Sequence, residues 1–198
     1  MSVRTLRIAL WIAVAVASGA LAFYSLRGSS EETLKPVAFE IGGAFSMTDH
    51  TGRAVTEKDF AGTARAMFFG FTSCPDICPT TMTRMAEFMK ALGPAADRLK
   101  VILVSVDPER DTPDLLNVYV EAFDERFVGL TGTNTQLEAF AKAYKFYYKK
   151  VPTADGSYTM DHSAGVYLYD ASGAFRGTLD VHEPDAVALG KLRKLIGS

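Results

Sequence analysis

Cysteine and histidine are scarce in this sequence. Its 198 residues contain only two cysteines and three histidines. So few cysteines exclude a disulfide-rich secreted scaffold, which depends on several cysteine pairs. The two cysteines, Cys74 and Cys78, are separated by three residues, and a disulfide between them would close a loop too short to add much stability. We therefore expect a chemical role for the pair rather than a structural one.

A strong charge of either sign is also absent. The chain has 21 lysines and arginines against 23 aspartates and glutamates, a formal net charge of -2. It contains no basic run long enough to follow a phosphate backbone, so nucleic acid is not expected as a partner. The length predicts one well-packed domain with a short appendage rather than two ordinary domains.

One hydrophobic run, by contrast, is unusually long. Residues 8–26 (IALWIAVAVASGALAFYSL) carry no charge, and a helix of that length comes close to the roughly 30 Å of a bilayer's hydrocarbon core. The run predicts a single transmembrane helix. A cleaved signal peptide is the alternative, because Ala20-Leu21-Ala22 resembles a cleavage site. The uncleaved anchor is favoured because the apolar run continues past that point.

The charges around this run predict its orientation. Arg4 and Arg7 precede it, whereas one arginine and two glutamates follow within six residues. Because basic residues favour the cytoplasmic side, we expect a single-pass protein of the bacterial inner membrane with its C-terminal domain in the periplasm. We divide the chain into a membrane anchor or signal peptide (1–27), a polar linker (28–36) and one globular domain (37–198).

Several short segments have the pattern of β-strands, being apolar or alternating runs bounded by turn residues. They are residues 45–48, 53–55, 66–71, 99–106, 163–169 and 174–179. We expect the first two to form a hairpin that caps the domain without joining its core. The next two have the composition of buried central strands, and the last two predict a second hairpin.

Helical spacing of apolar residues predicts helices over residues 79–92, 113–123, 135–144 and 184–196. Thr112 is expected to cap the second helix, with Pro113 at its first position. Thr135 and Glu138 have the spacing of a capping box for the third. Val187 is expected on the apolar face of the last. The order of strands and helices predicts an α/β, thioredoxin-like fold, with a central mixed sheet flanked by helices and an extra N-terminal β-hairpin.

The most informative stretch is residues 69–79, FGFTSCPDICP. It places Cys74 and Cys78 between the end of a buried strand and the start of a helix, where the partial positive charge of the helix N-terminus favours the thiolate form. Thioredoxin-type redox sites have two residues between their cysteines, and the third residue here gives the sulfurs room to surround an ion. From this loop alone, a metal site and a redox pair without metal are equally open.

A metal site would need a third ligand, because two thiolates complete neither a copper nor a zinc site. His162 is the best candidate, since it lies in the loop before a predicted central strand, at the end of the sheet that should face the cysteine loop. His50, in the first hairpin turn, and His182, before the last helix, are expected to be solvated surface residues. A lone histidine before a strand is often structural, so on the residues alone that role stays open for His162.

Two aspartates lie next to the candidate ligands. Asp76 lies between the cysteines and Asp161 precedes the histidine, so either could orient a ligand or tune the charge of the site, while loop capping is the alternative for Asp76. The methionines within residues 82–89 have helical spacing and are expected in the core. Residues 107–111 (DPERD) form a charged loop that would either touch a partner or stay solvated and cap the next helix.

Taken together, these motifs resemble the Sco/SenC family of copper-binding proteins for cytochrome c oxidase assembly. The family pattern has an N-terminal membrane segment, an FGFTxCPDICP loop, an SVDPERDTP segment and a DHS tripeptide. Here the last three occur at residues 69–79, 105–113 and 161–163. The matches follow the family order and cover nearly the whole chain.

The resemblance implies a thioredoxin-like fold in which Cys74, Cys78 and His162 bind copper and deliver it to the CuA centre of cytochrome c oxidase subunit II. Two thiolates and an imidazole suit Cu(I), and Cu(II) is also compatible. The upstream copper donor has no signature in the sequence. Two other functions stay open: a thiol-disulfide oxidoreductase that reduces the CuA-site cysteines with the same two thiols, and a redox or copper sensor.

Overall fold

The computed structural model describes residues 2–27 and 40–197 of the chain. The chain divides into two compact units, residues 1–39 and residues 40–198. The expected linker over residues 28–36 lies outside the described residues.

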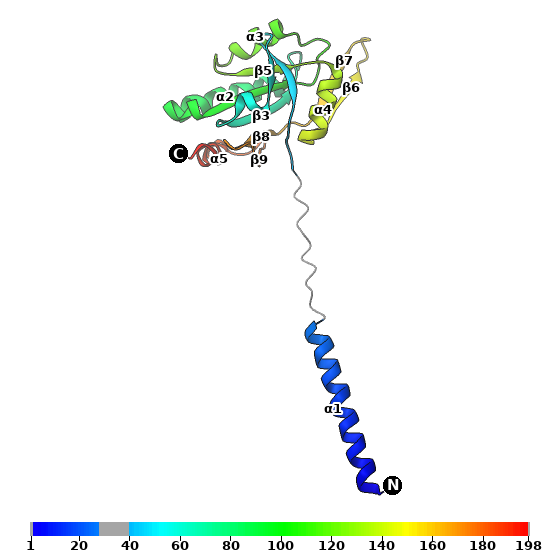
Figure 1. Cartoon of the computed structure of the whole chain (residues 1–198). Coiled ribbons are helices and arrows are strands. Elements are labelled where there is room, and N and C mark those ends of the chain that lie inside the picture. The colour runs from blue at the N-terminus through cyan, green and yellow to red at the C-terminus, as the bar shows by residue number, and fades with distance from the viewer. Residues whose placement is uncertain (1, 28–39, 198) are drawn as a thin grey trace. The chain divides into compact units, whose positions relative to one another are not determined.

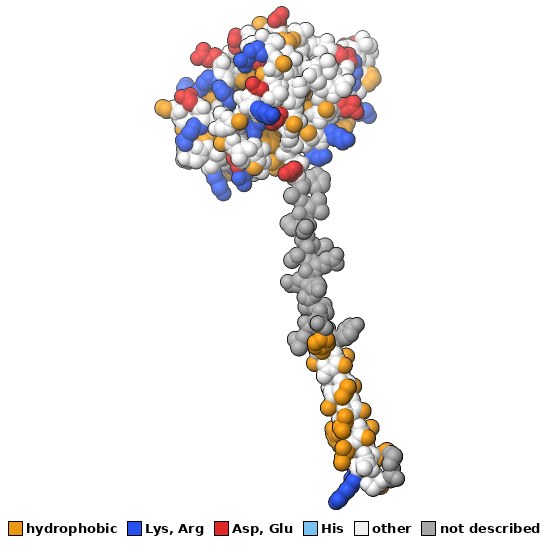
Figure 2. Space-filling view, viewed as in Figure 1, with side chains coloured by type: hydrophobic (Ala, Val, Ile, Leu, Met, Phe, Trp, Pro, Cys, Tyr) orange, Lys and Arg blue, Asp and Glu red, His pale blue; other side chains and the backbone are white. Residues whose placement is uncertain are grey.

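The first unit contains one long helix, α1 (Val3–Arg27). Its segment Val3–Phe23 is long and apolar enough to cross a membrane, with a mean hydropathy of 2.0 (Figure 1). Figure 2 shows hydrophobic side chains along the length of this helix. Its length and composition suit the expected membrane anchor, and a signal sequence has the same character.

The second unit is built on a seven-stranded sheet with the strand order β2-β1-β5-β4-β3-β8-β9. These strands are β1 (Ser46–Asp49), β2 (Ala54–Thr56), β3 (Ala64–Gly70), β4 (Leu99–Ser105), β5 (Val128–Thr131), β8 (Val166–Tyr169) and β9 (Phe175–Leu179). β4 runs parallel to both β3 and β5, and the other neighbouring pairs are antiparallel. Every residue of β3 is buried, so both faces of the sheet are covered at its centre.

The helices of this unit are α2 (Ile77–Leu92), α3 (Pro113–Glu121), α4 (Asn134–Tyr144) and α5 (Asp185–Ile196), with short 3-10 helices η1 (Glu57–Phe60) and η2 (Gly93–Arg98). α3 packs on β5, α4 on β1, and α5 on both β9 and α2 (Figure 1). The expected central mixed sheet flanked by helices is therefore confirmed. Thr112 caps α3 as expected, because its hydroxyl oxygen accepts a hydrogen bond from the Leu115 N–H.

The core role expected for the methionines of α2 is also confirmed. Met82, Met85 and Met89 are 0%, 2% and 1% exposed, because their spacing places all three on the helix face that meets the sheet. The helix ends where the sequence predicts, at Gly93 with a positive φ of 57°, followed by Pro94.

The N-terminal hairpin is part of the central sheet, so its expected role as a separate cap is wrong. β1 pairs with β2 and also, in the antiparallel sense, with β5, where Thr48 lies opposite Thr131. Met47 of β1 is only 1% exposed and belongs to the core. β5 was not expected from the sequence because it is only four residues long and contains a glycine, Gly129, which weakens the strand pattern.

The capping box of α4 lies two residues earlier than expected. The Thr133 hydroxyl accepts a hydrogen bond from the Gln136 N–H at 3.2 Å, and the Gln136 side-chain oxygen accepts one from the Thr133 N–H at 2.8 Å. Thr135 and Glu138 have the right residue types at the same spacing, but both lie inside the helix.

The apolar face of α5 differs from the expected one by a single position. Val187 is 49% exposed, whereas Ala188, Leu192 and Ile196 are buried. These three recur every four residues and so lie on one side of the helix. Ala188 was not predicted as a core residue because its small side chain adds little to an apolar sequence pattern.

Candidate metal centre

The cysteine loop is fixed by the strand and the helix that it connects. Cys74 lies in the loop between β3 and α2 and is half-buried, and Cys78 lies in the first turn of α2 with 0% exposure. A β-carbon on Gly70, the last residue of β3, would lie 2.8 Å from the Cys78 Sγ atom. Only glycine therefore lets the backbone approach this thiol so closely.

His162 is the last residue of a strand, so the loop position expected for it is wrong. It ends β7 (Tyr158–His162), which pairs with β6 (Tyr148–Pro152) in a separate two-stranded sheet, and the central strand β8 begins only at Val166. β6 could not be predicted from the sequence because most of its residues face solvent and its apolar residues do not alternate.

The imidazole of His162 is oriented by its own backbone neighbour. Its Nδ1 atom lies 3.0 Å from the Ser163 carbonyl oxygen, and its Nε2 atom lies 3.7 Å from Cys78 Sγ. A carbonyl oxygen only accepts hydrogen bonds, so this contact assigns the ring proton to Nδ1 and leaves the Nε2 lone pair directed at the thiols.

Cys74, Cys78 and His162 therefore come together as the sequence predicts. One donor atom from each lies within 4.8 Å of the other two, an arrangement that could hold a metal ion. The imidazole lies edge-on to the rings of Phe68 and Phe71, with centroids 6.0 Å and 5.8 Å away. Two sulfurs and one imidazole nitrogen in aromatic surroundings form a soft donor set, which fits copper or zinc better than magnesium or calcium.

The protonation of Cys78 differs from the expectation. Burial raises the pKa of its thiol well above the ordinary value, although a hydrogen bond with the Phe71 backbone opposes the shift. Loss of hydration of the charged form therefore outweighs the partial positive charge of the helix N-terminus. Without metal, Cys78 carries its proton at neutral pH, and a metal ion must displace that proton to bind.

Neither aspartate beside the candidate ligands contacts them directly. Asp76 occupies the N-cap position of α2 without a capping side-chain bond, and its carboxylate lies 3.5 Å from the Thr80 hydroxyl. Asp161 is exposed. Within residues 40–197, neither carboxylate forms a hydrogen bond or an ion pair with Cys74, Cys78 or His162. Their influence on the charge of the site remains a prediction.

The other two histidines lie elsewhere. His182 is exposed, as expected. His50 is not simply solvated, because its Nδ1 atom accepts a hydrogen bond from the Gly129 N–H at 3.1 Å. His50 therefore helps to join the turn of the first hairpin to β5.

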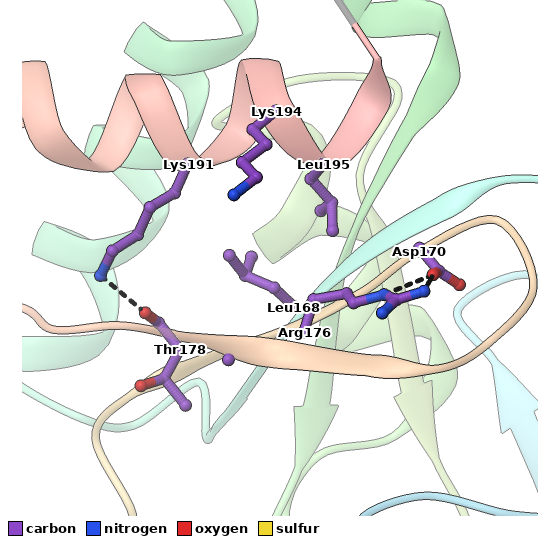
Figure 3. Close-up of a pocket in the computed structure, with 8 residues that line it drawn as sticks. Leu168, Asp170, Arg176, Thr178, Lys191, Lys194 and Leu195 are labelled. Atoms are coloured by element: carbon purple, nitrogen blue, oxygen red, sulfur yellow. Dashed lines mark hydrogen bonds and ion pairs between the residues drawn. The ribbon is translucent and has the colours of Figure 1, made fainter.

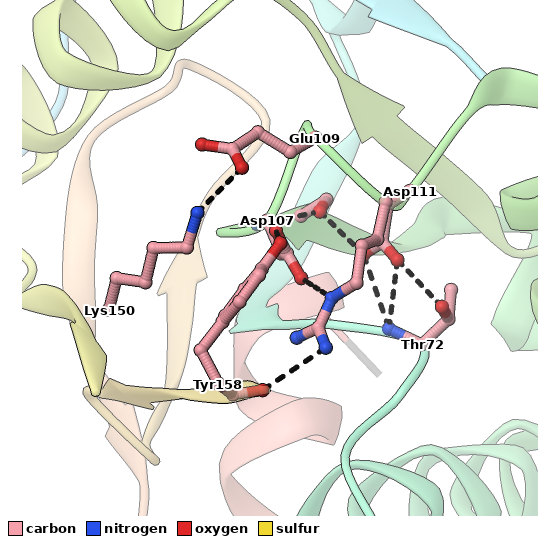
Figure 4. Close-up of polar contacts among 8 residues, drawn as sticks. Thr72, Asp107, Glu109, Asp111, Lys150 and Tyr158 are labelled. Carbon is pink, nitrogen blue, oxygen red and sulfur yellow. Dashed lines mark hydrogen bonds and ion pairs between the residues drawn. The ribbon is translucent and has the colours of Figure 1, made fainter. Parts of the chain in front are cut away.

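The charged loop 107–111 folds back onto the cysteine loop, a contact that sequence reasoning missed. Asp111 is completely buried. Its carboxylate accepts hydrogen bonds from the Thr72 N–H at 3.2 Å, the Thr72 hydroxyl at 2.6 Å and the Ser105 hydroxyl at 2.6 Å (Figure 4). Burial raises the pKa of Asp111, and these hydrogen bonds oppose the shift. The only sequence signal for this contact is a cluster of polar residues directly after a buried strand.

A cavity of about 770 Å³ lies between the β8–β9 hairpin and α5, away from this centre (Figure 3). Lys191 and Lys194 of α5 face Arg176 and Thr178 of β9 across it, and Lys191 donates a hydrogen bond to the Thr178 carbonyl at 3.0 Å. None of the three candidate ligands lines it, so it is not the metal centre.

The chain is similar to known proteins in both sequence and structure. The family model described as SCO1/SenC matches residues 35–197. The SCO2-like protein of Rickettsia felis is 36% identical over 138 residues, which are 69% of this chain and 67% of that protein. The human mitochondrial SCO1 homolog is 38% identical over 138 residues, which are 68% of this chain but only 46% of the human protein.

Solved structures give the same result. Bradyrhizobium japonicum ScoI with copper bound is 42% identical, has a TM-score of 0.73, and is matched over 78% of this chain and 99% of that one. Yeast Sco1 with copper bound is 30% identical, has a TM-score of 0.74, and is matched over 80% of this chain and 90% of that one.

Proposed function

The chain belongs to the SCO1/SenC family, and from this premise we propose that it is a copper metallochaperone. The observation that carries the proposal is the convergence of Cys74, Cys78 and His162, whose donor atoms lie within 4.8 Å of one another. In the proposal these three residues hold the copper. The copper-bound structures of the Bradyrhizobium and yeast relatives support the choice of metal.

The donor set favours Cu(I) as the cargo. Two thiolates and a neutral imidazole are soft or borderline ligands, and Cu(I) accepts low coordination numbers, while the same donors also accept Cu(II). His162 is prepared for this role because its Nδ1 proton is engaged by the Ser163 carbonyl, which fixes the ring orientation and keeps Nε2 available.

We propose that copper leaves by ligand exchange with thiolates of the target. Cys74 is half-buried and Cys78 is fully buried, so an incoming thiolate reaches the Cys74 side of the site first. A new sulfur–copper bond forms as the Cys74–copper bond breaks, and Cys74 takes a proton from solvent. Donors of the target then replace the His162 nitrogen and finally Cys78, which takes up a proton in turn. The proposed recipient is the CuA centre of cytochrome c oxidase subunit II.

We further propose that residues 1–27 remain as the membrane anchor, residues 28–36 act as the linker, and residues 37–198 form the copper-binding domain in the periplasm of a bacterium. The charge asymmetry around α1 supports this orientation. The intact mass of the protein from the membrane fraction tests whether the anchor is retained. Protease treatment of spheroplasts should digest the domain if it lies outside the inner membrane.

The copper site is tested most directly by His162→Ala in the full chain, with the exposed His182→Ala as the matched control. Loss of an outer partner of a metal ligand typically lowers metal affinity about 10–100-fold, so loss of a direct ligand should lower Cu(I) affinity at least as much. Stability without copper should change little because His162 is only half-buried at a strand end. Equal Cu(I) affinity in the two variants would remove His162 from the ligand set.

Transfer is tested by mixing the copper-loaded chain with copper-free subunit II and following the purple two-copper centre. The wild-type chain should form it, whereas Cys74→Ser and His162→Ala should form little. Failure of the wild-type chain to transfer copper would contradict the proposed recipient.

Thiol-disulfide exchange is the second candidate function. It is favoured by the pairing of a half-buried thiol, Cys74, with a buried one, Cys78, which suits an attacking and a resolving cysteine. The pair would give two electrons and two protons to a disulfide of the target and become a disulfide itself. His162 would then be dispensable, so a target reduced equally well by His162→Ala and by the wild-type chain, without copper transfer, would favour this function.

A further inference from the structure

The two parts of the metal centre lie on elements that share no backbone ladder. Cys74 and Cys78 belong to the end of β3 and the start of α2, whereas His162 belongs to the two-stranded β6–β7 sheet. The distance between the thiols and the imidazole therefore depends on side-chain contacts. Residues 107–111 supply contacts to both parts (Figure 4).

One side of this segment holds the cysteine loop. Asp111 is 0% exposed, and its carboxylate accepts hydrogen bonds from both the N–H and the hydroxyl of Thr72, two residues before Cys74. The Ser105 hydroxyl satisfies the same carboxylate from the end of β4. Because all these groups are buried or half-buried, the loop cannot move away without leaving a carboxylate unsatisfied, which is costly.

The other side holds the β6–β7 sheet at Tyr158, four residues before His162. The Tyr158 hydroxyl donates a hydrogen bond to Asp107 at 2.9 Å, and Arg110 Nη1 donates one to the Tyr158 carbonyl at 3.1 Å. The Arg110 guanidinium also lies 3.9 Å from the centroid of the Tyr158 ring. Asp107, which pairs with the Nε atom of Arg110, is 2% exposed. Near the surface, Lys150 of β6 pairs with Glu109 at 2.6 Å.

Arg110 also reaches the wall of the metal centre. Its guanidinium lies 5.7 Å from the centroid of the Phe71 ring. The Phe71 ring in turn lies edge-on to the imidazole of His162, so Phe71 lies between Arg110 and His162 in this series of contacts. Capping of the next helix, the other role expected for residues 107–111, does not explain these contacts. The hydrogen bond that caps α3 comes from Thr112.

We propose that Asp107, Arg110 and Asp111, together called the clasp, hold β7 at the distance from the cysteine loop that lets His162 complete the metal centre. Arg110 is a positioning residue that acts on His162 through Tyr158. The expected effect of the clasp on copper affinity rests on the proposed function. The restraint of β7 by the clasp can be tested without metal.

The metal-free test is amide hydrogen exchange of the full chain in detergent. Arg110→Met should raise exchange of β7 amides, residues 158–162, about tenfold, while β3 and β4 stay unchanged. Tyr158→Phe, which removes only the hydroxyl contact with Asp107, should have a smaller effect in the same place. Arg126→Met is the matched control, since Arg126 forms a local ion pair with Asp124 at 2.6 Å.

The metal test is a double-mutant cycle of Cu(I) affinity. Arg110→Met should weaken binding about tenfold in the wild-type background and leave it unchanged in the His162→Ala background, because the positioned ligand is then already absent. Arg110→Lys should restore little, since an ammonium cannot satisfy Asp107 and the Tyr158 carbonyl in the same planar geometry.

Unchanged exchange of β7 in Arg110→Met, or an equal loss of affinity with and without His162, would overturn the clasp. If His162→Ala itself binds Cu(I) like the wild type, the proposed ligand role fails instead. The exchange experiment then decides alone whether the clasp holds β7. The two failures are therefore distinguishable.

Discussion

Replacing Gly70 by alanine should damage both the fold and the metal centre. The added β-carbon would lie 2.8 Å from Cys78 Sγ, 2.8 Å from the Phe68 ring and 3.3 Å from Leu103. The first two distances are about 0.6 Å shorter than ordinary van der Waals contact. Because Phe68, Leu103 and Cys78 are all 0% exposed, none of them can relieve the contact by moving into solvent.

The expected magnitude follows from two opposing effects. Overpacking of a dense core costs about 1–3 kcal/mol, whereas replacing glycine by alanine lowers the entropy of the unfolded chain and returns about 0.5–1 kcal/mol. Gly70→Ala should therefore lower the free energy of unfolding by about 1 kcal/mol, with about 2.5 kcal/mol as the upper limit. Gly165→Ala is the matched control because its β-carbon would meet only the Leu179 carbonyl at 3.6 Å and Thr178 at 3.9 Å, so it should be neutral or slightly stabilising.

Thermal unfolding of the metal-free chain, followed by circular dichroism, measures this difference as about 2–4 °C per kcal/mol. Cu(I) affinity then shows which atom moves. Displacement of Cys78 Sγ lowers stability and moves a ligand directly, so affinity falls strongly. Displacement of the Phe68 ring lowers stability and affects affinity only weakly, through its edge-on contact with His162. If Gly70→Ala and Gly165→Ala have the same melting temperature and the same affinity, the close approach of the β3 backbone to the thiol is refuted.

Three further predictions concern the pH dependence of copper affinity, the pH dependence of stability, and the stability of α5. Because Cys78 is protonated in the metal-free fold, Cu(I) affinity measured by competition should rise with pH, by about tenfold per unit for each proton released. Burial raises the pKa of Cys78 above its unfolded value of about 8.5. The contribution of this thiol to the free energy of unfolding is therefore fully present below pH 8.5 and is lost as the pH rises. Between pH 8.5 and 10 the free energy of unfolding should fall by up to about 1.4 kcal/mol per pH unit, and this fall should be absent in Cys78→Ala. Gly190→Ala, in an exposed part of α5 with nothing within 4 Å of the added carbon, should stabilise the chain by about 0.5–1 kcal/mol, and an unchanged melting temperature would contradict this.

The central part of the fold could be predicted because its sequence has strong patterns. β3 and β4 are short continuous apolar runs, and α2 repeats its methionines at helical spacing between clear boundary residues. Membership of the SCO1/SenC family confirms the thioredoxin-like fold that this order predicts. β6 and β7 were not predicted because Lys149 and Lys150 face solvent, which removes the apolar alternation of a strand. The sheet is held by side-chain contacts with residues 107–111, such as that of Tyr158, which no local pattern specifies.

The candidate site was predictable in its residues but not in its electrostatics. The two thiols are local in sequence, and only three histidines compete for the third position, so His162 could be chosen without knowing that it ends a strand. The protonation state of Cys78 could not be predicted, because it depends on the burial of its thiol in the folded domain, where Cys78 is 0% exposed. The tie between Thr72 and Asp111 spans 39 residues, and no local pattern specifies a contact at that separation.

The two ends of the seven-stranded sheet restrict how this protein meets others. At one end β2 has only three residues. At the other, the pairing of β9 with β8 is interrupted by a shift in register, and the Thr178 carbonyl is occupied by Lys191. Short, irregular or covered edges are poor templates for an added strand, so the sheet resists end-to-end polymerisation between copies of this chain. We therefore expect the recipient in the proposed copper transfer to be recognised through side chains and loops rather than by extending this sheet.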